Sequence, residues 1–290
     1  MDKITSVLKE YTTFNEVEVQ KNIEDLLLKR KTANHTKKVY ETILSCIDLT
    51  SLNTTDTEEG IATMVQKVNN FGEKYPELPN VAAICVYPSM VKTVRDCLTE
   101  GVEIASVAAG FPHSQTFIEI KVAETALAIL DGASEIDVVL SVGKLLEKKY
   151  EEIVEELQEI KAACKDAHLK VILESGALKM EDLRVASILS MESGANFIKT
   201  STGKQQPAAT LTAAYVMCKL IREYFDKTGR KVGFKAAGGI ATTEEALDYY
   251  CIVEDVLGEE WLQKELFRFG ASRLANNILT ELFEKPTSEF

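Results

Sequence analysis

The chain has 290 residues, 46% of them hydrophobic, a length that suits one sizeable α/β domain. Its formal net charge of −12 opposes attraction to nucleic acid and to anionic membrane surfaces, so we expect neither as a partner. No apolar run reaches the ~20 residues of a membrane span. The opening lacks a signal-peptide pattern and the six cysteines form no CxxC pair, which favours a cytoplasmic protein with reduced thiols.

Residues 1–40 carry a rough apolar stripe with helical spacing. The stripe consists of Val17, Val19, Ile23, Leu26 and Leu27. We expect residues 1–40 to form an N-terminal helical extension, which either plugs the bottom of the following domain or makes a subunit contact. No low-complexity or Pro/Gly-rich linker divides the remainder, so residues 41–290 are predicted to be one domain.

From about Ile43 onward, short apolar runs typical of buried β-strands alternate with segments of helical periodicity. The runs with strand character are Ile43–Leu49, Val81–Val86, Val102–Ala109, Glu135–Leu140, Leu169–Leu173, Asn196–Thr200, Lys231–Ala236 and Leu266–Phe269. The helical segments include Phe117–Leu130, Leu145–Ala163, Leu183–Ser193, Thr212–Tyr224 and Thr243–Val256, with a final helix at Ser272–Phe283.

This alternation predicts the α/β class and, because eight strands are counted, a closed (β/α)₈ barrel with an N-terminal helical extension. The alternative is an open doubly wound sheet, which usually carries a glycine-rich phosphate turn after its first strand. The segment Asp48–Ser51 contains no glycine, so the barrel is favoured.

Charged side chains recur where the predicted strands end. They are Asp48, Asp137, Glu174, Lys199 and Lys235. In α/β barrels the C-terminal ends of the strands build the active site, whereas a lone charge in the packed interior is costly. We therefore expect these side chains to face one rim of the barrel.

Asp137 and Lys199 each lie five positions after a glycine, in two predicted strands with similar sequence patterns. They should therefore lie at comparable depths in the barrel and meet across the pocket. Lys235 lies one strand further on. A lysine becomes a nucleophile only when burial or a neighbouring ammonium lowers its pKa from about 10.4. The cluster predicts amine catalysis by one of the two lysines, with Asp137 as a proton carrier. The alternative is a structural Lys–Asp ion pair.

Glycine-containing turns follow the last three predicted strands. They are Thr202-Gly203-Lys204, Gly238-Gly239 and Gly270-Ala271-Ser272. Barrels commonly bind phosphate at these places through backbone N–H groups and a helix N-terminus. The three turns together predict a site for a phosphate monoester, although each could be only a tight turn.

The sequence offers little for a metal centre. No two of the three histidines are close in sequence, and there is no HExxH motif or cysteine cluster, so we expect neither a catalytic zinc nor an organic cofactor. Cys85, at the end of the second predicted strand, is a candidate substrate contact, and the alternative is a packing thiol.

Several of these motifs occur in the order found in one known group of enzymes: from about Ile47 to Leu282 the chain resembles the deoxyribose-phosphate aldolase family, class I aldolases with a TIM-barrel fold. The motifs that carry this resemblance are Asp48-Leu49-Thr50, Ile84-Cys85-Val86-Tyr87-Pro88, Glu135-Ile136-Asp137-Val138-Val139, Phe197-Ile198-Lys199-Thr200-Ser201-Thr202-Gly203, Gly233-Phe234-Lys235 with Ala237-Gly238-Gly239, and Arg268-Phe269-Gly270-Ala271-Ser272.

The resemblance implies a lyase that reversibly cleaves 2-deoxy-D-ribose 5-phosphate to acetaldehyde and D-glyceraldehyde 3-phosphate, in carbohydrate and deoxynucleoside catabolism. It implies that Lys199 forms the Schiff base, that Lys235 perturbs it and that Asp137 relays protons. By the same likeness, the groups around the phosphate are Gly203, Lys204, Gly238, Gly239 and Ser272, and Asp48 and Thr50 lie near the sugar hydroxyl. The expected partners are a sugar phosphate and aldehydes, and the sequence is compatible with a homo-oligomer.

The chain departs from the family pattern at four places: residues 1–40 exceed the usual start, Ala236 stands where proline is expected, Arg273 where a second serine is common, and Phe290 where some relatives end in tyrosine. A terminal phenylalanine cannot pass a proton. Two other functions stay open at this point. One is another class I barrel aldolase or transaldolase acting on a different sugar phosphate, and the other is a non-catalytic barrel that binds sugar phosphates.

Overall fold

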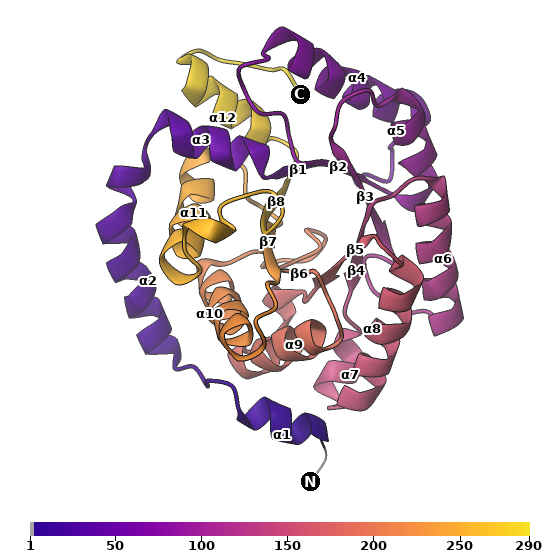
Figure 1. The fold of residues 1–290 in the computed structure, drawn as a ribbon, viewed down its shortest axis with the longest axis vertical. Coiled ribbons are helices and arrows are strands. Elements are labelled where there is room, and N and C mark those ends of the chain that lie inside the picture. Colours follow the sequence, from indigo (N-terminus) through magenta and orange to yellow (C-terminus); the bar gives the residue numbers. More distant parts are fainter. Residues whose placement is uncertain (1–2) are drawn as a thin grey trace.

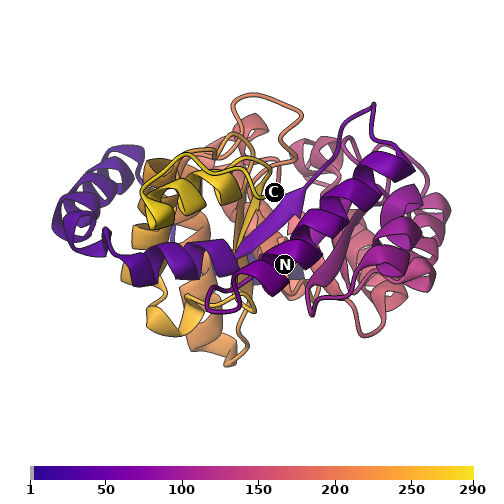
Figure 2. The same ribbon diagram turned by 90° about the horizontal axis from the view of Figure 1, so that it is seen from above.

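The computed structural model describes residues 3–290, and within them parallel strands form a closed barrel in the order β1 to β8, with β8 pairing back to β1. Figures 1 and 2 show the helices arranged around this barrel. The predicted (β/α)₈ fold is confirmed. The strands are β1 Ile47–Thr50, β2 Ala83–Val86, β3 Glu103–Ala108, β4 Glu135–Val139, β5 His168–Ile172, β6 Phe197–Lys199, β7 Gly233–Ala237 and β8 Phe267–Ala271.

The helices before and between the strands are α1 Lys3–Lys9, α2 Glu16–Arg30, α3 Lys37–Ser45, α4 Glu58–Lys74, α5 Val91–Cys97, α6 Ile118–Asp131, α7 Val142–Leu146, α8 Tyr150–Cys164, α9 Met180–Glu192, α10 Leu211–Thr228, α11 Thr243–Val256 and α12 Leu274–Phe283. Short 3₁₀ turns lie at Thr32–Asn34, Pro88–Met90, Ser175–Ala177 and Glu259–Trp261. None of the helices in residues 3–290 is long and apolar enough to span a membrane.

Threonine side chains begin several of the outer helices. Thr57, Thr210 and Thr242 each accept a hydrogen bond from a backbone N–H in the first turn of α4, α10 and α11, respectively. Thr242 also forms a capping box with Glu245. Because each of these helices starts just beyond the C-terminal end of a strand, the caps fix the loops on one rim of the barrel.

Two predicted boundaries are wrong. The expected strand from Ile43 begins only at Ile47, because Ile43–Ser45 is the last turn of α3 and buries Ile43 and Leu44 as a helix does. The predicted helix Leu145–Ala163 is two helices, α7 and α8. The helix is interrupted at Lys148, whose positive φ of 59° is incompatible with a continuous helix.

The N-terminal helices do not plug the barrel. α2 packs on the outer side of α10 and α11, and Arg30 of α2 bonds Asp255 at 2.7 Å (Figure 1). Arg184 Nη1 in α9 donates to the carbonyl of Leu8, 2.8 Å away, and so fixes the end of α1 against the helical ring. Helix α3 crosses the boundary expected at residue 40.

The C-terminal residues fold back onto the ring of helices. The ring of Phe290 lies 4.8 Å from that of Phe71 in α4, centroid to centroid, and its backbone N–H and carbonyl both bond the side chain of Asn276. Phe290 is not among the residues that line the pocket described below.

Candidate active site

The interior of the barrel contains charged side chains from six of its strands. They are Asp48 from β1, Glu135 and Asp137 from β4, Lys170 from β5, Lys199 from β6, Lys235 from β7 and Arg268 from β8, and each is at most 3% exposed. Burying a charge is costly unless it is paired. Such a layer is therefore stable only as a connected network.

Asp137 joins the two lysines that the sequence singled out. Its Oδ2 accepts hydrogen bonds from Lys199 Nζ at 2.8 Å and from Lys235 Nζ at 2.7 Å. Lys235 Nζ also donates to Asp48 Oδ2 at 2.5 Å. The structure thus brings Asp48, Asp137, Lys199 and Lys235 into one group, although they come from four strands.

Sequence reasoning missed the other half of the network. Arg268 bridges Asp48 Oδ1 at 2.6 Å and Glu135 Oε1 at 2.8 Å, and Lys170 donates to Glu135 Oε2. A lone charge in the barrel interior would be costly, but these side chains are paired with oppositely charged ones there. The available signal was strand alternation: Glu135 precedes Asp137 by two positions and so points to the same face, into the barrel.

The charges of the network do not balance if every group is ionised. There are four cationic side chains and three carboxylates, so the network is neutral when one cation gives up its proton. The carboxyl pKa values of Asp48, Glu135 and Asp137 are all lowered: burial opposes ionisation but the surrounding cations outweigh it.

Lys199 is the cation whose proton is held least firmly. Burial lowers the pKa of Lys199, and the Lys235 ammonium lowers it further, although the Asp137 carboxylate opposes both effects. Burial alone would also lower the pKa of Lys235, yet the carboxylates of Asp137 and Asp48 raise it above its ordinary range. The pKa values of Lys170 and Arg268 are raised by carboxylates in the same way, against the effect of burial. Lys199 is therefore the cation of the network that loses its proton most readily.

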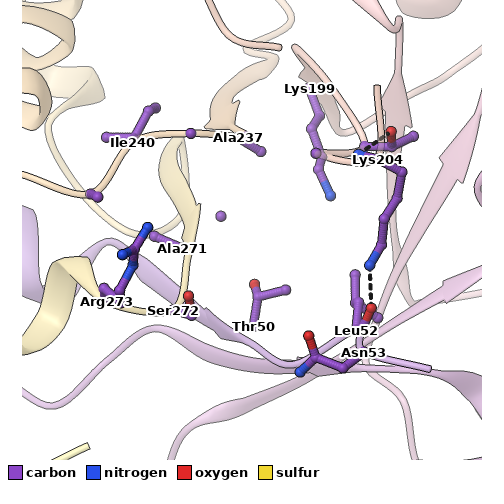
Figure 3. Close-up of a pocket in the computed structure, with 16 residues that line it drawn as sticks. Thr50, Leu52, Asn53, Lys199, Lys204, Ala237, Ile240, Ala271, Ser272 and Arg273 are labelled. Carbon is purple, nitrogen blue, oxygen red and sulfur yellow. Dashed lines mark hydrogen bonds between the residues drawn. The ribbon is translucent and has the colours of Figure 1, made fainter. Parts of the chain in front are cut away.

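A pocket of about 240 Å³ lies above the network, and Lys199 is the one charged member of the network that lines it. Figure 3 shows the Lys199 side chain extending into the space between Ala237, Thr50 and Lys204. The hydroxyl of Thr50 also lines the pocket and donates to the backbone carbonyl of Asp48 at 2.8 Å. The Lys199 amine thus faces the cavity while its partners stay beneath it.

Two of the glycine turns pack against each other at the wall of the pocket. Gly203 and Gly238 have φ values of 76° and 95°, which favour glycine, and a Cβ added to Gly238 would lie 3.2 Å from Gly203 Cα and 2.7 Å from Ala208 Cβ. Gly239, at φ 85°, would meet nothing within 4 Å. Its peptide is therefore open to the cavity.

Polar and basic side chains complete this wall. Ser272 and Arg273 line the pocket just before α12, and the Arg273 guanidinium has no hydrogen-bond or ion-pair partner within residues 3–290. Lys204 lies on the opposite side, and its Nζ donates to the carbonyl of Leu52 across the mouth of the pocket (Figure 3). Cations thus flank the cavity on two sides.

Two predicted substrate contacts do not line the pocket. Asp48 lies below it and is occupied by Lys170, Lys235 and Arg268. Cys85 is fully buried among the apolar side chains between β1 and β3, and burial raises the pKa of its thiol. Glu174, predicted to face the rim, accepts from the hydroxyl and the N–H of Thr202 and so holds the turn after β6.

The chain is similar to known aldolases. A family model described as DeoC/LacD family aldolase matches residues 42–251. The chain is 40% identical over 261 residues to deoxyribose-phosphate aldolase of Homo sapiens, covering 84% of this chain and 80% of that protein. It is 39% identical over 264 residues to deoxyribose-phosphate aldolase of Bos taurus, covering 85% and 81%. The tetrameric deoxyribose phosphate aldolase of Aeropyrum pernix superimposes with a TM-score of 0.69 at 23% identity, covering 89% of this chain and 97% of that one, and supports the fold.

Proposed function

The chain belongs to the DeoC/LacD family of aldolases, and from this premise we propose that it is an aldehyde-lyase acting on 2-deoxy-D-ribose 5-phosphate. It cleaves this substrate reversibly to acetaldehyde and D-glyceraldehyde 3-phosphate through a Schiff base on Lys199. The observation that carries the proposal is the position of Lys199, which faces the pocket from a network that has one more cationic side chain than carboxylates.

The reaction begins when the neutral amine of Lys199 attacks the C1 carbonyl of the open-chain sugar. The carbinolamine loses water to give a protonated Schiff base. Removal of the C3 hydroxyl proton then breaks the C2–C3 bond, its electron pair passes into an enamine, and glyceraldehyde 3-phosphate leaves. Protonation of the enamine at C2 and hydrolysis release acetaldehyde and restore the amine.

Asp137 is the proposed proton carrier for these steps, because its Oδ2 lies 2.8 Å from Lys199 Nζ. Its Oδ1 accepts no hydrogen bond within residues 3–290 but lies 3.3 Å from the Lys170 ammonium, with which it forms an ion pair. Lys235 stays protonated beside it and keeps Lys199 neutral by its field. We propose that Asp48 acts through Lys235 rather than on the substrate, since its oxygens are already occupied.

The phosphate site proposed here is the glycine wall of the pocket. Gly203, Gly238, Gly239 and Ser272 supply the backbone and hydroxyl donors, and Arg273 and Lys204 supply cations on two sides of the pocket. Local donors of this kind are required because the chain as a whole has a net charge of −12, which repels a phosphate dianion. Thr50, on the wall beside Lys199, is placed to meet a sugar hydroxyl.

The test is borohydride reduction in the presence of acetaldehyde, followed by peptide mass analysis. The expected result is one added ethyl group, on Lys199. In the matched variant Lys199→Arg the adduct should disappear and kcat should fall by far more than tenfold, because a guanidinium keeps its charge but cannot become an amine nucleophile. An adduct on another lysine, or on none, would overturn the assignment.

Turnover of deoxyribose 5-phosphate against fructose bisphosphate separates the proposed substrate from that of another class I aldolase. A sugar-phosphate-binding barrel without catalysis would turn over neither. We also propose a cytoplasmic location, supported by six cysteines that are all unpaired, five of them buried.

A further inference from the structure

Strand β6 departs from the regular sheet pattern immediately after Lys199. In a parallel sheet, the carbonyls of successive residues point alternately toward the two neighbouring strands. The Lys199 carbonyl accepts a hydrogen bond from the N–H of Leu173 at 2.9 Å, and the next carbonyl, that of Thr200, accepts from the N–H of Ser175 at 2.8 Å. Both partners lie on the β5 side of the strand. The Thr200 carbonyl is therefore turned away from β7, where the alternation would place it.

The hydroxyl of Thr200 replaces this carbonyl on the β7 side. Its Oγ1 accepts from the N–H of Ala237 at 2.9 Å and donates to the carbonyl of Ala237 at 3.0 Å. A single hydroxyl can do both, because it has one proton and two lone pairs. Thr200 is fully buried and Ala237 is only 4% exposed, and a buried backbone group without a partner is costly. The position of Ala237 therefore depends on this side chain.

Ala237 connects this link to the glycine wall of the pocket. It lines the pocket together with Lys199 and immediately precedes the turn Gly238-Gly239 (Figure 3). On its other side it pairs with Gly270 of β8, where an added Cβ would lie 2.9 Å from the Ala237 Cβ. The end of β7 is thus held closely between β6 and β8. Through Ala237, the Thr200 hydroxyl joins the strand that carries the amine to the turn that begins the wall.

We propose that Thr200 is a positioning residue that sets the separation between the Lys199 amine and the glycine wall. This inference rests on the proposed function, in which one substrate molecule is held at both places, by its C1 on Lys199 and by its phosphate at the wall. Thr200 is not among the residues that line the pocket, so it acts through Ala237 and does not touch the substrate. A misplacement of about 1 Å can cost roughly 100-fold in rate when reacting groups must be aligned.

The consequence is specific to ligands that occupy both places at once. Acetaldehyde condenses with Lys199 and needs no phosphate site, and the hydrogen bond of Lys199 to Asp137 does not involve Thr200. Inorganic phosphate needs the wall but not the amine. A change in the separation between the two places should therefore impair the cleavage of deoxyribose 5-phosphate and spare the binding of these two smaller ligands.

The first test compares Thr200→Val with Thr200→Ser. Valine keeps the shape of the side chain but removes both hydrogen bonds to Ala237, so kcat/KM for deoxyribose 5-phosphate should fall by about tenfold or more. Borohydride trapping of acetaldehyde on Lys199 and competitive inhibition by inorganic phosphate should stay close to the wild-type values. Serine retains the hydroxyl and should restore most of the lost kcat/KM. A serine variant no better than the valine variant, or equal losses of cleavage and trapping in Thr200→Val, would overturn the proposal.

The matched control is Thr125→Val. Thr125 lies in α6 and is also fully buried, but its hydroxyl has no hydrogen-bond partner within residues 3–290. The same chemical change there removes no hydrogen bond and should leave cleavage, trapping and phosphate inhibition unchanged. Circular dichroism at the assay temperature checks that each variant is folded when its activity is measured. An equal fall of kcat/KM in the two valine variants would contradict a specific role of Thr200.

The second test combines Thr200→Val with Gly238→Ala. If Thr200 acts by holding the glycine wall in place, a wall that the alanine has already displaced loses little more when the hydroxyl is removed. The fall of kcat/KM in the double variant should therefore be smaller than the product of the falls in the two single variants. A fall equal to that product would show that the two residues act independently, and the proposal would be wrong.

The wild-type chain distinguishes a failure of this inference from a failure of the proposed function. If the wild type forms no borohydride adduct with acetaldehyde on Lys199 and does not cleave deoxyribose 5-phosphate, the proposed function is refuted and the positioning role with it. If the wild type does both and Thr200→Val retains its full kcat/KM, only the positioning role is refuted.

Discussion

Lys199 differs from the other three cations of the buried network in two respects: it lines the pocket, and its pKa is lowered. The cause is the balance of neighbours. Lys235 contacts two carboxylates, Asp48 and Asp137, whereas Lys199 contacts only Asp137 and faces the charge of Lys235. Reactivity at this residue is therefore a property of the group of charges around it.

Replacing Lys235 tests this balance. In Lys235→Leu the network has three cations for three carboxylates, so Lys199 can stay protonated and its pKa should rise. At neutral pH we expect kcat/KM to fall by roughly 10²-fold or more, and part of the loss to return as the pH is raised. A pH–rate profile that falls uniformly without moving would show that Lys235 acts by position or proton transfer, not by its field.

The two cations beside the pocket should differ in their effects. The Arg273 guanidinium has no partner within residues 3–290, so Arg273→Ser should lower kcat/KM for deoxyribose 5-phosphate by about one to two orders of magnitude, corresponding to a charge-assisted contact of roughly 1.5–3 kcal/mol. Turnover of unphosphorylated deoxyribose should barely change. Lys204 also donates a hydrogen bond to the Leu52 carbonyl, so Lys204→Ala should lower the turnover of both substrates.

The control for the cations is Lys92→Ala, which removes one exposed positive charge from α5, outside the pocket lining. This variant should leave the ratio of the turnover of deoxyribose 5-phosphate to that of unphosphorylated deoxyribose unchanged. If Arg273→Ser lowers turnover of both substrates equally, the phosphate does not lie at Arg273.

At the level of elements, the strand-to-helix turns are specified by local chemistry. Threonine caps begin α4, α10 and α11, and glycines with positive φ allow the turns after β6 and β7 to pack together. Glu174, itself in a left-handed conformation, ties the turn after β6 through Thr202. The wall of the pocket is thus held in place by contacts within the chain itself.

Gly238→Ala should disturb that wall. The added Cβ would lie 2.7 Å from Ala208 Cβ at a φ of 95°, so the turn must shift. We expect KM for deoxyribose 5-phosphate to rise tenfold or more, equivalent to at least ~1.4 kcal/mol of lost binding. Gly229→Ala is the matched control: it imposes similar backbone strain at φ 71°, but its Cβ meets nothing within 4 Å. An equal rise of KM in both variants would contradict a local role for Gly238.

At the scale of the whole molecule, the charged network makes stability depend on pH. The cations lower the pKa values of Asp48, Glu135 and Asp137 below those of the unfolded chain, against the effect of burial. A group with a lowered folded-state pKa contributes stability that is complete above its unfolded pKa, near ~4, and is lost as the pH falls through the folded value. Stability should therefore decline progressively below about pH 4.

Arg268→Met measures this contribution. Because the variant leaves the buried carboxylates of Asp48 and Glu135 short of a partner, the free energy of unfolding at pH 7 should fall by about 3–5 kcal/mol. Urea unfolding at pH 7 and pH 3 should show a smaller loss at the lower pH. The surface control Arg95→Met, which breaks an exposed pair with Asp96, should cost less than ~1 kcal/mol. Equal losses in the two variants would show that the network does not contribute to stability.

The sequence alone determined the (β/α)₈ fold, because strand and helix periods repeat along the chain and depend only on local burial. It also placed Asp137, Lys199 and Lys235 on strands, and the family resemblance chose between the two lysines. It did not reveal Glu135, Lys170 and Arg268 as part of the same network, or that Asp48 lies beneath the pocket. Those contacts join residues up to 220 positions apart. The spacing of apolar residues along a sequence indicates that a side chain is buried, but it does not indicate which side chain lies opposite it in a closed barrel.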